Sequence, residues 1–80
     1  MKAKIEVYLK EGVLDPQGAT IKRALDTMGY RGIKELRQGK IFYIQLEDMD
    51  REEAAKLLDE IGRKVLSNPV IEDYKWEIEG

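Results

Sequence analysis

The feature that most constrains the fold is a change, along the chain, in the spacing at which apolar residues recur. Residues 3 to 9 alternate in polarity, as a half-buried strand does, and their apolar face consists of Ala3, Ile5, Val7 and Leu9. Residues 21 to 28 instead carry apolar side chains at helical spacing, at Ile21, Ala24, Leu25 and Met28. The chain is therefore expected to combine strands with amphipathic helices.

Residues 13 to 18 define the start of the first helix. Asp15 suits the N-cap position, and Pro16 suits the first helical position, where no amide hydrogen is needed. Gly29 is placed to end the helix. Gly18 then falls in the first turn, where its missing side chain indicates either a close neighbour or simple tolerance of glycine. A bound phosphate is disfavoured, because Asp15 would occupy the free amides and repel an anion.

Residues 32 to 47 are predicted to form a hairpin, with Gln38, Gly39 and Lys40 as its tight connection. The returning strand has a clean apolar face made of Phe42, Ile44 and Leu46. Ile41 and Tyr43 point the other way, which indicates that something covers the outer face of the sheet.

The second helix is predicted to begin at Asp50, with Glu53 completing a pair like a capping box. Asn68 and Pro69 end it. Its apolar stripe consists of Ala54, Leu58, Ile61 and Val65. The last strand, residues 70 to 79, places Tyr74, Trp76 and Ile78 on one face.

These elements predict an α+β fold in a single domain of residues 1–80: a two-layer βαββαβ-like domain whose antiparallel sheet carries both helices on one face. A chain of this length builds only a modest core. Without Cys or His it has neither disulfides nor the usual zinc ligands to supplement that core. Self-association is the expected supplement.

The residue inventory excludes most kinds of catalytic site. There is no imidazole base, no thiolate and no nucleotide-binding motif of the Walker A or GxGxxG type. Glu47, Asp48 and Asp50 carry oxygen ligands suited to Mg²⁺ or Ca²⁺, but the start of a helix explains them better. We expect no catalytic, metal-binding or cofactor-binding residue in this chain.

Charge and hydropathy narrow the range of partners. The 14 basic and 16 acidic residues are interspersed and give a net charge of −2, which disfavours nucleic-acid binding. No segment is apolar enough for a signal peptide or a membrane span, so we expect a cytoplasmic protein.

Three stretches of the sequence together resemble a known family: LKEGVLDPQGATIKRAL at residues 9–25, the Gly39-Lys40 pair, and NPVIEDYKWEIE at residues 68–79. They are similar to the PurS family, the small subunit of phosphoribosylformylglycinamidine synthase. The resemblance covers nearly the whole chain in register. Between residues 26 and 66 it is mainly one of pattern.

The resemblance implies a non-catalytic subunit of a purine-biosynthesis ligase. In that complex a glutaminase subunit releases ammonia from glutamine, and a large synthetase subunit uses ATP and Mg²⁺ to convert formylglycinamide ribonucleotide to the amidine. The small subunit bridges these two, supports ammonia transfer and forms a homodimer or homotetramer. It binds no cofactor itself.

Two sets of residues are candidates for these contacts. Asp15, Gln17 and Gly18 are candidates for contact with a partner subunit, and Tyr8, Ile41 and Tyr43 are candidates for self-association. Two alternatives from other classes stay open at this point. One is a small dimeric sensor domain that binds an amino acid or other metabolite, and the other is an RNA-binding module with Phe42, Tyr74 and Trp76 on its sheet.

Overall fold

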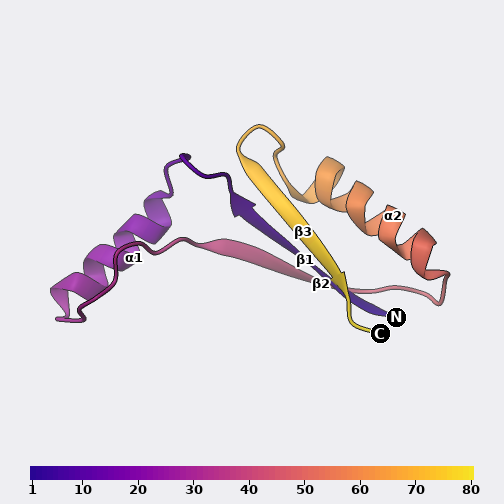
Figure 1. Ribbon diagram of the computed structural model, residues 1–80, viewed down its shortest axis with the longest axis horizontal. Helices are drawn as coiled ribbons and strands as arrows, with labels where there is room; N and C mark the ends of the chain where they lie inside the picture. The colour runs from indigo at the N-terminus through magenta and orange to yellow at the C-terminus, as the bar shows by residue number, and fades with distance from the viewer.

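The computed structural model describes residues 1–80, which form a three-stranded antiparallel sheet and two helices (Figure 1). In chain order the elements are β1 (Lys2–Leu9), α1 (Pro16–Thr27), β2 (Gly39–Gln45), α2 (Arg51–Ile61), a π-helical turn η1 (Gly62–Leu66) and β3 (Glu72–Ile78). The strand order is β2-β1-β3, with β1 in the centre. The predicted α+β class with an antiparallel sheet is confirmed.

The register of the strands explains which side chains form the core. Ile5 of β1 lies opposite Phe42 of β2 and Trp76 of β3. The apolar faces predicted for the three strands therefore lie on the same side of the sheet. Helix α2 covers this face. The buried apolar residues are Ala3, Ile5, Val7, Ala54 and Leu58, and the partly buried side chains around them include Phe42, Ile44, Leu46, Ile61, Leu66, Tyr74 and Ile78.

The predicted hairpin within residues 32 to 47 is wrong, because no strand precedes Gly39. Ile33 and Leu36 are three residues apart, which is not the alternation of a strand, and this segment runs beyond the sheet. Gly39 and Lys40 begin β2 instead of forming a tight turn. A Cβ at Gly39 would stand 2.9 Å from the Val7 carbonyl oxygen, so glycine permits this close approach of β1 and β2.

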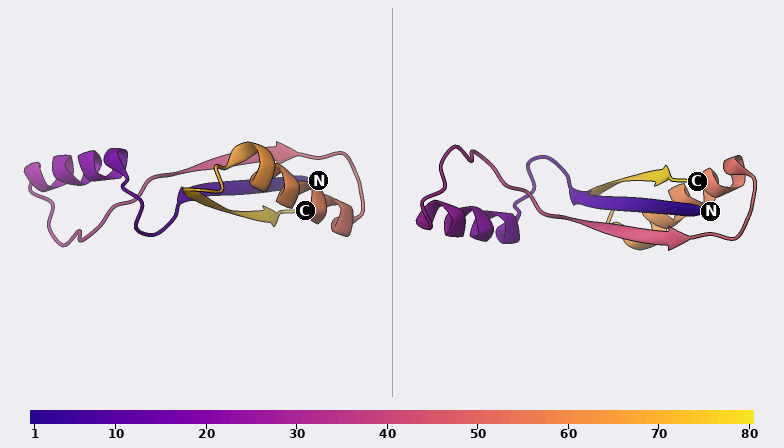
Figure 2. Two further views of the ribbon diagram at one scale, coloured as in Figure 1. Left: turned by 90° about the horizontal axis from the view of Figure 1, so that it is seen from above. Right: turned by 90° about the horizontal axis from the view of Figure 1, so that it is seen from below.

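The predicted placement of both helices on one face of the sheet is also wrong. Helix α1 lies beyond the end of the sheet, at the opposite end of the molecule from the two termini (Figures 1 and 2). The inner face of a three-stranded sheet is already occupied by α2, and Gly18 is the one buried residue of α1. We call residues 10–36, which include α1, the arm; Arg37 and Gln38 then lead directly into β2.

The arm makes the molecule elongated. Its principal extents are 49 × 26 × 15 Å and its Cα radius of gyration is 16.0 Å, whereas a compact domain of this length has about 12 Å. The accessible surface is 6162 Å², while a compact monomer of 9.3 kDa exposes about 5,000 Å². The excess, about 1,200 Å², exceeds the roughly 800 Å² that one partner buries in an ordinary protein interface.

The helix ends confirm most of the capping predictions. Asp15 is the N-cap of α1, Pro16 opens the helix, and Gly29 follows its C-cap with a φ of 94°. Asp50 occupies the N-cap position of α2, but its side chain makes no capping hydrogen bond. The start of α2 therefore relies on Glu52 and Glu53, acidic residues in its first turn, for favourable interaction with the helix dipole.

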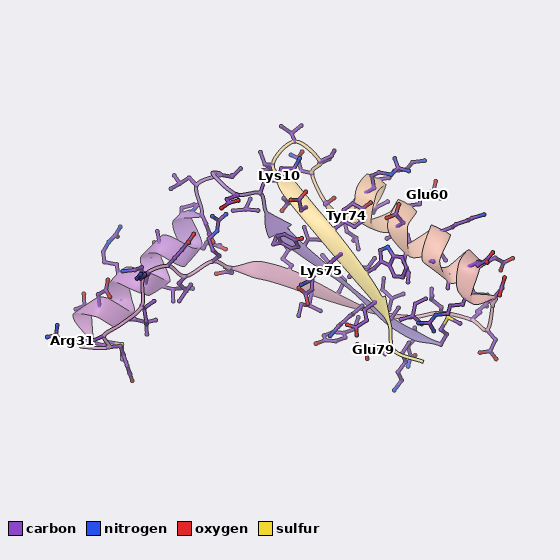
Figure 3. All side chains as sticks on the ribbon, viewed as in Figure 1. Lys10, Arg31, Glu60, Tyr74, Lys75 and Glu79 are labelled. Carbon is purple, nitrogen blue, oxygen red and sulfur yellow. The ribbon has the colours of Figure 1, made fainter.

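The π-helical turn corrects the predicted apolar stripe of the second helix. Its wider turn, closed by a hydrogen bond from Ser67 N–H to the Gly62 carbonyl, places Leu66 against the core and leaves Val65 exposed. Gly62 faces the Tyr74 ring, and the Tyr74 hydroxyl donates a 2.9 Å hydrogen bond to Asp59. Figure 3 shows Tyr74 on β3, beside α2.

Replacement of Gly62 by Ala is expected to destabilise the domain. A Cβ there would stand 2.7 Å from the Tyr74 ring, and such overpacking costs about 1–3 kcal/mol, against a gain of about 1 kcal/mol in helix propensity. We expect a net loss of about 1 kcal/mol in urea unfolding, followed by fluorescence of Trp76, the single tryptophan. Arg63→Ala, at an exposed position of the same turn, is the control; an unchanged midpoint for Gly62→Ala would contradict the contact.

Candidate functional site

The carboxylates considered as metal ligands do not gather into a metal centre. No group of three or more acidic, His or Cys residues lies close enough together to hold a metal ion. Asp48, one of the carboxylates considered as a ligand, is fully exposed and lies 3.9 Å from the terminal amino group of Met1. None of the helices has the length and apolar character needed to cross a membrane.

The polar contacts instead concentrate where the arm joins the sheet. The Asp15 carboxylate accepts two backbone hydrogen bonds there, one per oxygen: Oδ1 from Gly18 N–H at 2.9 Å, and Oδ2 from Gln38 N–H at 2.8 Å. The first bond caps α1 and the second bridges 23 residues to the segment that enters β2. One side chain therefore joins the start of α1 to the returning chain.

The same two hydrogen bonds set the charge of Asp15. The bond from Gln38 lowers the pKa of the carboxyl most, the bond from Gly18 lowers it further, and the Arg37 guanidinium adds a smaller effect. Because the folded pKa lies below the ordinary value of 3.8, the carboxylate's contribution to stability is complete above that value. It is lost only as pH falls through the lowered pKa.

Gly18 lies in the tightest part of this junction. A Cβ on Gly18 would stand 2.5 Å from the Leu36 carbonyl oxygen and 2.5 Å from Oδ2 of Asp15. Real Cβ atoms do not approach other atoms so closely. The neighbour for which Gly18 leaves room is thus Leu36 of the same chain.

Arg37, Gln38 and Gln17 complete the junction. Arg37 Nη2 donates to the carbonyl oxygens of Lys10 and Val13, both at 3.3 Å, so it ties the loop after β1 to the segment before β2. The amide side chains of Gln38 and Gln17 are joined by a 2.6 Å hydrogen bond, with Gln38 as the donor. Sequence reasoning missed Arg37 and Gln38, because the predicted hairpin placed both away from Asp15.

The sheet face opposite α2 forms a second candidate surface, which we call the open face. Tyr8, Ile41 and Tyr43 all lie on it, and the exposed fractions of Ile41 and Tyr43 are 48% and 76%. The part of the open face formed by β2 is apolar. The part between β1 and β3 instead carries ion pairs, which join Lys4 to Glu77 and Glu79, and Lys75 to Glu6. Figure 3 labels Lys75, which lies on β3. The Lys75 ammonium lies 6.0 Å from the centre of the Tyr8 ring.

The structure thus brings each set of candidate residues together, and the two sets adjoin at a hollow lined by Tyr8, Asp15 and Gln17. Asp15, Gln17 and Gly18 surround the base of the arm, and Tyr8, Ile41 and Tyr43 line the open face. A hollow of about 600 Å³ beside Tyr8 is lined mainly by residues of charged or polar type.

Comparisons with known proteins agree on one family. Residues 2–80 match the family model described as PurS, phosphoribosylformylglycinamidine (FGAM) synthase. The chain is 44% identical over 78 residues to the phosphoribosylformylglycinamidine synthase subunit PurS of Bacillus subtilis (strain 168), an alignment that covers 98% of this chain and 92% of that relative.

Solved structures show the same fold. The crystal structure of PurS from Methanocaldococcus jannaschii, one of the subunits of formylglycinamide ribonucleotide amidotransferase, aligns with a TM-score of 0.86 at 40% identity, covering 98% of this chain and 94% of that chain. A chain in the structure of PurLQS from Thermotoga maritima aligns with a TM-score of 0.85 at 33% identity, covering 95% of this chain and 93% of that chain.

Proposed function

Since this chain belongs to the PurS family, we propose that it serves as the non-catalytic small subunit of phosphoribosylformylglycinamidine synthase, an ATP-dependent ligase of purine biosynthesis. In this role it bridges the large synthetase subunit and the glutaminase subunit and supports ammonia transfer between them. The match of residues 2–80 to the family model is the observation that carries the proposal.

The residue inventory supports a division of labour within the complex. Release of ammonia from glutamine requires a nucleophile, which in this enzyme is a Cys of the glutaminase, and this chain has neither Cys nor His. Activation of the amide oxygen of formylglycinamide ribonucleotide uses ATP and Mg²⁺, which we assign to the large subunit. We propose that this chain binds no cofactor and acts in the cytoplasm with the rest of the pathway.

The shape of the molecule supports a bridging role. The arm and the sheet with α2 are two parts joined end to end, and they span 49 Å. Large apolar side chains are exposed on both parts, at Leu14, Ile21, Met28 and Tyr30 on the arm and at Tyr8, Ile41 and Tyr43 on the open face. An elongated chain with apolar surface at both ends is suited to contacting more than one partner.

The candidate residues fit two kinds of contact in this assembly. We propose that the open face with Tyr8, Ile41 and Tyr43 contributes to self-association. We propose that the base of the arm, with Asp15, Gln17 and Gly18, lies near a partner subunit. Gln17 is the exposed member of that set, whereas Gly18 is enclosed by its own chain.

The metabolite-sensor alternative gains no support. The relatives that the chain matches are PurS subunits and not sensors. Thermal-shift measurements with amino acids and nucleotides distinguish the two functions, because a ligand that binds the folded state raises its stability. The subunit function predicts no stabilisation of the isolated chain.

Replacement of Tyr43 by Glu is expected to weaken self-association. The change places a charge on the apolar side of the open face, where burial against a second copy would desolvate it. We expect the sedimentation-derived mass at low micromolar concentration to fall to that of one chain. Gln45→Glu makes the same charge change on the same strand without removing an apolar side chain and serves as the control. An unchanged mass for Tyr43→Glu would remove the open face from the interface.

The proposed bridge is tested by sedimentation velocity with the purified large synthetase, the glutaminase and this chain. We expect one fast-sedimenting species that contains all three proteins, and separate species when this chain is left out. Co-sedimentation of the synthetase and glutaminase at full yield without this chain would contradict the bridging role.

A further inference from the structure

Apolar packing does not determine the angle between the arm and the sheet. Helix α1 is not packed on the sheet (Figures 1 and 2). At the junction, a hollow of about 270 Å³ lies between the first turn of α1 and the ends of β1 and β2; its lining includes Leu9, Pro16, Gln17, Gly39 and Glu72. Because α1 makes no extensive contact with the sheet, the orientation of the arm depends on the polar contacts of the junction.

Among those contacts, only the Asp15 carboxylate is held by two backbone donors. Backbone N–H groups have fixed directions, so the bonds from Gly18 and Gln38 define both the distance and the angle between the two segments that they join. The contacts of Arg37 are longer, and the bond between Gln38 and Gln17 joins two exposed side-chain ends. Bonds to a charged acceptor are also the stronger kind.

We propose that Asp15 is a positioning residue: its bridge from the first turn of α1 to Gln38 fixes the angle at which the arm leaves the sheet, and thereby the relative placement of the two surfaces that the synthase complex engages. The effect on the synthase complex rests on the proposed function, but the fixed angle is a property of the chain itself. At neutral pH the carboxylate is charged, so the bridge is present under working conditions.

A conservative substitution separates the bridge from the helix cap. In Asp15→Asn the side chain keeps its size and its ability to cap a helix, but it has a single acceptor oxygen. Whichever way the amide is turned, one of the two N–H groups loses its partner. Asp26→Asn makes the same charge change within α1, where Asp26 pairs only with Lys22, and is the matched control.

The angle is measured as a distance between two spin labels. Because the chain has no Cys, Arg23→Cys in α1 and Lys56→Cys in α2 introduce labels only at these exposed positions. A large excess of unlabelled chain confines the measured distances to one protomer. We expect a narrow distribution for the parent chain and for Asp26→Asn, and a broader, shifted distribution for Asp15→Asn with far-ultraviolet circular dichroism unchanged.

The functional readout is the ratio of glutamine-driven to ammonia-driven product formation in the reconstituted complex. For Asp15→Asn we expect this ratio to fall about tenfold, because a lost bond to a charged group depopulates the competent orientation. If Asp15→Asn loses the helical signal of α1, Asp15→Ser takes its place, since Ser caps a helix but is too short to reach Gln38 as well.

A broadened distance together with a lower ratio supports the proposal. A narrow distribution for Asp15→Asn overturns it, whether or not activity falls, and a broad distribution with full glutamine-driven activity overturns the functional consequence. Failure of the proposed function looks different. In that case the parent chain itself is not needed for glutamine-driven activity, and the distance measurement is unaffected.

Discussion

Gly18→Ala is expected to destabilise the packing of the arm at its junction with the sheet. In an ordinary helix interior, the same change stabilises the helix by about 1 kcal/mol. The new Cβ would stand 2.5 Å from both the Leu36 carbonyl oxygen and the Asp15 carboxylate. The first is backbone and the second is held by two hydrogen bonds, so neither moves easily. Overpacking of this kind costs about 1–3 kcal/mol.

Amide hydrogen exchange reports this effect locally. We expect exchange in α1 and at Gln38 to accelerate about 10- to 100-fold in Gly18→Ala, while β1 and α2 keep their protection, because the arm and the core open separately. Thr20→Ala in the same helix, where Thr20 is exposed, should leave the arm protected to within a few-fold. Slower exchange in Gly18→Ala than in the parent chain would show that the junction has room for a side chain.

Leu58→Ala should have the largest effect on the sheet and α2. Leu58 is fully buried and belongs to a core of only five buried apolar residues. Truncation of a buried leucine costs about 2–5 kcal/mol, whereas a domain of this size has a total stability of about 4–12 kcal/mol. We expect the urea midpoint, followed by Trp76 fluorescence, to fall by a third or more.

Leu57 offers a matched control for that measurement. It has the same side chain, is the neighbouring residue in α2 and is 36% exposed, so Leu57→Ala should cost less than about 1 kcal/mol. Both variants are compared at one protein concentration, since self-association adds to the apparent stability. Equal losses for the two variants would mean that an assembly interface, and not the core of one chain, limits the stability.

The strands and helix ends were predictable because local patterns determine them. Alternation around Ile5 assigned β1 and its core face, and the Asp15-Pro16 pair located the start of α1. Val65 was wrongly assigned to the apolar stripe, because a π turn shifts the helical register of the following residues by one. No residue type in that stretch indicates such a turn.

The position of α1 was not predictable from the sequence, because it depends on what covers the sheet. A βαββαβ pattern leads one to expect two helices on a four-stranded sheet, but the segment around Leu36 joins no strand, and α2 alone covers the narrower sheet. The same error concealed the junction. Asp15 and Gly18 were identified as residues with a close neighbour or a partner, yet Gln38 and Leu36 were assigned to a hairpin elsewhere.

The elongated shape and the lack of Cys and His both fit a subunit that contacts partners. The chain has no Cys and no His, so it supplies neither a thiolate nor an imidazole. The apolar core sits between α2 and the sheet, while the arm extends from it through a junction of hydrogen bonds.

In the proposed complex, glutamine-driven synthesis depends on this chain. The most direct measurement combines the large synthetase and the glutaminase with ATP, Mg²⁺ and formylglycinamide ribonucleotide, and compares product formation from glutamine and from ammonium chloride, with and without this chain. We predict that the chain restores the glutamine-driven reaction and leaves the ammonia-driven rate of the synthetase nearly unchanged. A full glutamine-driven rate in the absence of this chain would show that the chain is not needed for ammonia transfer.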